Sequence, residues 1–185
     1  MRWTGLFDDL EAQAIDLFAA ERSAEVADRT RGEFGRVQLS DRLRPALGSA
    51  VRLRCVGAQA VNGHIRRVGA EWVLIDEGFG REALVLLTGV LTVSGLGRLS
   101  SSPGSAGVVE SRLGLRHVLR ALIRDRSGVQ LALVDGTIAG GTLDRLGRDF
   151  VELAAHPAGE ARRGPAVREV LLVPLSGLVL VRRDE

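Results

Sequence analysis

The chain has 185 residues, of which 45% are apolar, and a formal net charge of +2 at pH 7. All 25 basic residues are arginines, which excludes a lysine-dependent phosphate-binding loop, and the near balance of charge lacks the basic footprint typical of nucleic-acid-binding proteins. No apolar run approaches the roughly 18–20 residues of a membrane helix, and acidic residues interrupt the N-terminal sequence, so we expect no signal peptide, no membrane partner and a cytoplasmic location.

Residues 1–38 are the first predicted segment, with a long helix over about 5–36. Apolar residues recur there at spacings of three and four, namely Phe7, Leu10, Ala14, Leu17 and Phe18. Beyond Ala20 the apolar stripe thins and consists largely of alanine. Such a helix either covers the rest of the chain or forms a coiled coil with a second copy, and the sequence leaves both open.

A short helical turn is predicted next, over residues 40–48, with Ser40 as its N-cap and Gly48 as its end. A strand then begins at about Ala50. Apolar residues alternate with arginines over Val51–Val56, which predicts that Cys55 is a buried thiol. Because it is the single cysteine, an internal disulfide and a cysteine-rich zinc site are excluded.

The second half of the chain repeats the first. Val51–Ile75 aligns without a gap with Val129–Leu153, at an offset of 78 residues, and the glycines and aliphatic positions agree. An acid–aromatic–valine trio recurs within this match, as Glu71-Trp72-Val73 and Asp149-Phe150-Val151. Leu87–Val93 then matches Leu175–Val181 at an offset of 88 residues, because the second copy has a longer polar loop.

Each copy is predicted to form a short helix followed by five strands. In the second copy the helix spans about 107–124 and the first strand spans 129–134. The second strand follows the turn at Asp135-Gly136 and ends at about 145, and the other three strands span 150–154, 170–173 and 178–182. We therefore predict an α+β chain, mostly β, with two tandem five-stranded antiparallel barrels, each preceded by a helix. The boundaries are 1–38 for the N-terminal helix, 39–95 for the first barrel, 96–105 for a Gly/Ser linker and 106–185 for the second barrel with its leading helix.

This pattern resembles the Sm-like proteins, the family that includes bacterial Hfq. The resemblance rests on Leu133–Gly136, Gly141–Leu143, the acid and aromatic before Val151, and Val173–Leu178, where the family has the turn between its last two strands. The chain is also similar to proteins of high-GC Gram-positive bacteria. The resemblance implies small barrels that assemble by pairing the fourth strand of one with the fifth strand of the next, and it implies RNA binding.

The family's base-contacting positions differ in this chain. Gly69 and Gly147 stand where the family carries an aspartate, and Val73 and Val151 stand where it carries an asparagine that contacts bases. The lysine–histidine pair of Hfq is also missing. The family's uridine pocket is therefore not carried over.

The predicted nucleic-acid-binding residues lie on or beside the equivalent turn of each copy and are His64, Arg66, Arg67, Arg145 and Arg148. Arginine offers a bidentate fork to phosphate. The alternative is a solvated strand face whose arginines pair with neighbouring acids. The histidines are scattered and no nucleophile motif occurs, so we predict no metal, no cofactor, no catalytic residue and no enzyme activity.

Two functions are weighed, and RNA binding is kept as the predicted function because it is the sharper, testable claim; a third, sequence-specific DNA regulation, has the weakest support, since no helix-turn-helix with basic recognition residues is found. The first is an RNA-binding regulatory protein, in which three chains close a ring of six barrels. The second is a structural or protein-interaction module that oligomerises through barrel edges or the N-terminal helix, and the low net charge and the missing base contacts favour it. A homo-oligomer is expected in either case, with RNA or a protein as the further partner.

Overall fold

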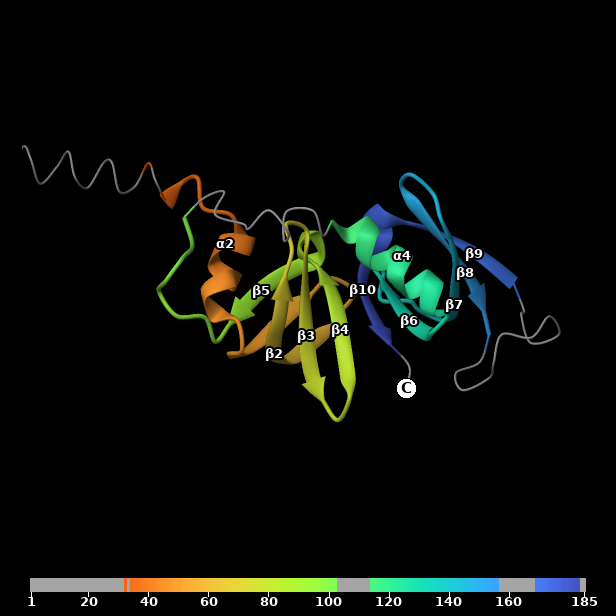
Figure 1. Cartoon of the computed structure of the whole chain (residues 1–185), viewed down its shortest axis with the longest axis horizontal. Coiled ribbons are helices and arrows are strands. Elements are labelled where there is room, and N and C mark those ends of the chain that lie inside the picture. The colour runs from red at the N-terminus through yellow and green to blue at the C-terminus, as the bar shows by residue number, and fades with distance from the viewer. Residues whose placement is uncertain (1–31, 33, 103–113, 157–168, 184–185) are drawn as a thin grey trace, which may run out of the picture. The chain divides into compact units, whose positions relative to one another are not determined.

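The computed structural model of the chain describes residues 32, 34–102, 114–156 and 169–183 (Figure 1). The chain divides into two compact units, Met1–Val37 and Gln38–Glu185. The helix predicted over residues 5–36 lies almost entirely outside the described residues. All ten described strands belong to the second unit.

Short helices and ten strands make up the described part of the second unit. The helices are α2 (Leu39–Leu43), the 3-10 helix η1 (Arg44–Ala46) that continues it, α4 (Leu115–Asp125), η2 (Leu87–Gly89) and η3 (Leu175–Gly177). The strands of the first half are β1 (Ala50–Cys55), β2 (Ala60–Val68), β3 (Trp72–Gly78), β4 (Arg81–Leu86) and β5 (Val90–Ser94). The strands of the second half are β6 (Gly128–Leu133), β7 (Ile138–Leu146), β8 (Phe150–Ala155), β9 (Glu169–Pro174) and β10 (Leu178–Arg183).

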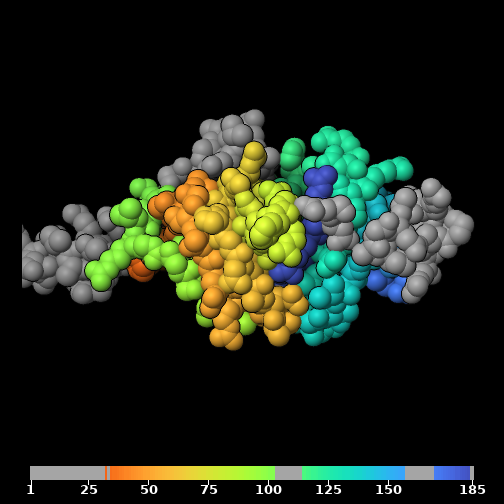
Figure 2. All heavy atoms as spheres, turned by 90° about the horizontal axis from the view of Figure 1, so that it is seen from below, coloured from red at the N-terminus to blue at the C-terminus, as the bar shows by residue number. Residues whose placement is uncertain are grey.

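The ten strands form one antiparallel sheet in the order β5-β1-β2-β3-β4-β10-β6-β7-β8-β9, so the prediction of two separate five-stranded barrels is wrong. The two halves meet at a joint in which β4 pairs with β10, a fourth strand with a fifth. Because β10 also pairs with β6, it has a hydrogen-bonded neighbour on both of its edges, and the sheet continues from one half into the other. Figure 2 shows the blue β10 between the yellow-green residues of the first half and the cyan residues of the second.

The two halves share one internal strand order, β5-β1-β2-β3-β4 in the first and β10-β6-β7-β8-β9 in the second. Backbone hydrogen bonds also recur at the offsets of the sequence alignment. The Leu87 N–H donates to the Glu71 carbonyl at 2.9 Å, and the Leu175 N–H donates to the Asp149 carbonyl at 2.8 Å. A β-bulge interrupts β2 and β7 at equivalent positions. Positions in the two halves can therefore be compared residue by residue.

Two clusters of buried apolar residues form the core, and each takes side chains from both halves. Trp72, Leu84 and Leu86 of the first half pack in the cluster that contains most of the buried apolar residues of the second half. Conversely, Val179 and Leu180 pack in the cluster of the first half. These five side chains are at most 3% exposed. The exchange follows from the joint, because side chains on neighbouring strands lie beside one another.

An aromatic ring covers the glycine at the turn between the second and third strand of each half. A Cβ on Gly69 would lie 2.4 Å from Nε1 of Trp72, and a Cβ on Gly147 would lie 2.3 Å from Cε1 of Phe150. Real Cβ atoms essentially never approach other heavy atoms so closely. Glycine at both positions, where the Sm-like family carries an aspartate, therefore has a packing reason in this chain.

Two local predictions have different outcomes. Cys55 is buried, as the alternation in β1 predicted, and burial raises the pKa of its thiol. Ser40, the predicted N-cap, instead lies inside α2. The cap is Gln38, whose N–H donates to Oδ2 of Asp41 at 2.9 Å. This reciprocal capping box starts the helix two residues earlier than the hydroxyl side chain suggested.

Candidate interaction surfaces

Two of the predicted phosphate-binding arginines face carboxylates on the neighbouring strand. Nε of Arg66 lies 3.0 Å from Oδ2 of Asp76, and Nη2 lies 2.5 Å from the same atom. The backbone N–H of Gly78 and then the Arg66 guanidinium hold the pKa of Asp76 below its usual value. In the second half, Nε of Arg145 lies 3.9 Å from Oε2 of Glu152. A carboxylate on the neighbouring strand therefore partly neutralises the charge of each arginine.

The other three predicted residues are exposed and come from both halves of the sheet. His64 and Arg67 lie on β2, whereas Arg148 lies in the turn between β7 and β8. Four strands separate β2 from β7 in the order of the sheet, so His64 and Arg67 belong to the first half and Arg148 to the second.

The outer strands β5 and β9 expose leucines at positions that are buried at the joint. Leu172 of β9 is 62% exposed, whereas its equivalent in β4, Leu84, is 3% exposed. Leu91 of β5 is 61% exposed, whereas its equivalent in β10, Val179, is fully buried. Both strands are at the ends of the sheet order, so each has one edge without a neighbour in the described sheet. The sequence pattern of these strands does not predict the exposure of the two leucines, because such a pattern identifies the buried face of a strand and not whether its edge has a neighbour.

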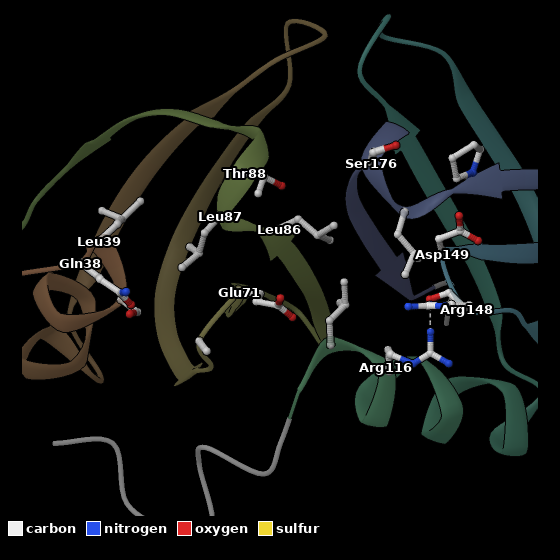
Figure 3. Close-up of a pocket in the computed structure, with 15 residues that line it drawn as sticks. Gln38, Leu39, Glu71, Leu86, Leu87, Thr88, Arg116, Arg148, Asp149 and Ser176 are labelled. Carbon is white, nitrogen blue, oxygen red and sulfur yellow. Dashed lines mark hydrogen bonds between the residues drawn. The ribbon is translucent and has the colours of Figure 1, made fainter. Parts of the chain in front are cut away.

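A groove of about 720 Å³, the seam groove, opens between the two halves (Figure 3). It is lined by Gln38, Leu39, Ser40, Ala70, Glu71, Leu86, Leu87, Thr88, Leu115, Arg116, Arg148, Asp149, Pro174, Leu175 and Ser176. Ten of these residues are five equivalent pairs, namely 70 and 148, 71 and 149, 86 and 174, 87 and 175, and 88 and 176. The turns and 3-10 helices of both halves therefore contribute in the same way to its walls.

The two walls of the seam groove differ in charge. Ala70 of the first half corresponds to Arg148 of the second, and the start of α4 adds Arg116 to the second wall, so two cations line that wall. Arg116 is held in place, because its Nη1 donates to the carbonyl of Arg148. Figure 3 shows Glu71 and Thr88 on one side of the groove, and Arg116, Asp149 and Ser176 on the other. Sequence reasoning placed Arg148 at a turn but did not identify the groove.

Within the described residues, no group of three or more His, Cys, Asp or Glu side chains is arranged to hold a metal ion. No described helix combines the length and the apolar character needed to cross a membrane. No protein-family model matches the chain, and no curated protein is significantly similar to it. The Sm-like resemblance therefore stays a prediction from sequence.

Proposed function

We propose that the protein is a non-catalytic interaction module that assembles with further copies of itself through its outer strands. The observation that carries this proposal is the exposure of Leu172 and Leu91 at positions whose equivalents are buried at the joint. The joint provides a template for the contact, because it already pairs a fourth strand with a fifth. β9 is the fourth strand of the second half and β5 is the fifth strand of the first half.

The register of the joint predicts the register between copies. At the joint Leu84 lies opposite Val181. The equivalent contact places Leu172 opposite Val93 of the next copy. Full burial of a leucine contributes about 1.5–3 kcal/mol, so two leucines that are already about 40% covered contribute on the order of 1–2 kcal/mol each. Backbone hydrogen bonds along the paired edges add to this, since edge strands present unpaired N–H and C=O groups.

The proposed contact is head-to-tail, so it produces either a closed ring or an open filament. A ring of six five-stranded halves, as the Sm-like resemblance suggests, needs three chains, so we expect a ring of three chains. The mass in solution tests this, by light scattering coupled to size exclusion at micromolar concentration. The expected value is three times the 19.8 kDa of the chain.

A charged substitution on an outer strand tests assembly without disturbing the fold. Leu172→Arg should give a folded monomer, because the guanidinium cannot be buried against β5 of the next copy. Val134→Arg is the control, since Val134 is 50% exposed and lies outside both outer strands. A monomeric wild type, or an unchanged mass for Leu172→Arg, would refute the proposal.

RNA binding is a second candidate, and the exposed side chains of Arg67 and Arg148 favour it. No ion pair involves either arginine within the described part of the chain. Fluorescence anisotropy with short single-stranded RNAs and a DNA duplex, over a salt series, tests it. Phosphate contacts predict an affinity whose logarithm falls linearly with log salt, with a smaller slope for Arg67→Gln and Arg148→Gln. No binding at low salt would remove this candidate and leave the assembly proposal standing.

A further inference from the structure

The seam groove has the size and the mixed chemistry of a ligand site. Its volume of about 720 Å³ lies within the roughly 300–1,000 Å³ that such sites occupy. Leucines from both halves, among them Leu86, Leu115 and Leu175, form much of its lining. A few polar groups converge on this apolar surface, which is the arrangement that orients a bound molecule.

The charges of the walls define which ligand fits. On the first wall, Glu71 is the one charged lining residue among those described. On the second wall, Arg116 and Arg148 outnumber Asp149 and give a net charge of +1. An apolar ligand with an anionic group at one end and a cationic group at the other complements both walls. The bond from Arg116 to the carbonyl of Arg148 fixes one guanidinium before any ligand arrives, which lowers the cost of ordering it.

We propose that the seam groove binds a peptide segment of a partner protein, with apolar side chains on the leucines, an acidic group at Arg116 and Arg148, and a basic group at Glu71. The hydroxyls of Thr88 and Ser176 lie on opposite walls and can bond backbone amides of a peptide. An acyl chain has no polar groups along its length that could bond these hydroxyls. A nucleic acid is less suited, because none of the described lining residues supplies an aromatic ring for base stacking. The inference does not depend on self-assembly.

The experiment selects peptides from a random displayed heptapeptide library on the full-length chain and measures their affinities by fluorescence anisotropy. We expect enriched peptides that carry two or more apolar residues and an acidic residue. Arg148→Glu should weaken their binding about tenfold, because the new carboxylate repels the acid. Replacing that acid in the peptide by lysine should restore binding to Arg148→Glu and weaken binding to the wild type. A merely structural role for Arg148 would not reverse the charge preference.

Two variants make the outcome decisive. Arg54→Glu is the control, because Arg54 is an exposed arginine outside the groove, and it should leave every affinity unchanged. Leu175→Glu should abolish binding of all selected peptides. No enrichment, or peptides that bind wild type and Arg148→Glu equally, would overturn the proposal. So would displacement of the peptides by single-stranded RNA, or an affinity that falls as the protein concentration rises, which would assign the groove to RNA or to a second copy.

Discussion

Gly69→Ala should destabilise the protein although it adds only one methyl group. The Cβ of an alanine would lie 2.4 Å from Nε1 and 2.5 Å from Cε2 of Trp72. Ordinary contact requires about 3.4 Å or more, so the ring must move by roughly 1 Å or the turn must open. Trp72 is 3% exposed and packs in the core cluster that spans the joint, so it has little room to shift. Overpacking of this kind costs about 1–3 kcal/mol.

Urea denaturation followed by tryptophan fluorescence measures this cost. The background variant Trp3→Phe leaves Trp72 as the single tryptophan reporter. Gly97→Ala is the matched control, because a Cβ there meets no atom within 4 Å. We expect a lower free energy of unfolding and a shifted emission maximum for Gly69→Ala, and no change for Gly97→Ala. Equal stability of the two variants would show that the ring does not depend on the glycine.

Three further predictions concern single side chains. Arg182→Gln should lower the free energy of unfolding by about 1–3 kcal/mol, because Arg182 forms a bidentate, partly buried ion pair with Glu77 (2.8 and 3.2 Å) across the joint; urea denaturation measures it, and no change would mean the pair adds nothing. Cys55 should react with a thiol reagent only at the rate of unfolding, since burial raises its pKa; rapid labelling of the folded protein would contradict its burial. The Gly78 N–H lowers the pKa of Asp76 below 3.8 in the folded protein. The contribution of Asp76 to stability is therefore present above pH 3.8 and is lost as the pH falls through the lower pKa of the folded state. The difference in stability between wild type and Asp76→Asn should vanish at low pH, and a constant difference would refute this.

Local patterns in the sequence predicted the strands and their sides. The alternation of apolar residues and arginines placed Cys55 on the buried side of β1, and the structure confirms it. The aligned glycines and aromatics likewise marked the turns at Gly69 and Gly147. Such patterns are readable because one face of a strand must be apolar wherever it covers a core, whatever its neighbours are.

The sequence did not predict which side chains form ion pairs between neighbouring strands. The acids next to the arginines along the chain were the expected ion-pair partners, whereas Arg66 bonds Asp76 and Arg145 faces Glu152, both on the neighbouring strand. In each half a β-bulge shifts the register at this point. A bulge changes which side chains lie opposite one another, and spacing along the chain does not reveal it.

The sequence by itself determined that the chain is mostly β, where the strands of its second half lie, and which face of β1 is buried. Only the tertiary structure decided that the two halves share one sheet, that Leu84 and Val179 are covered while Leu172 and Leu91 are exposed, and that a groove with unequal charges opens between the halves. The physical reason is that each strand has two hydrogen-bonding edges of similar chemistry. Its own residues therefore specify the buried face, whereas the choice of neighbour depends on how distant segments pack.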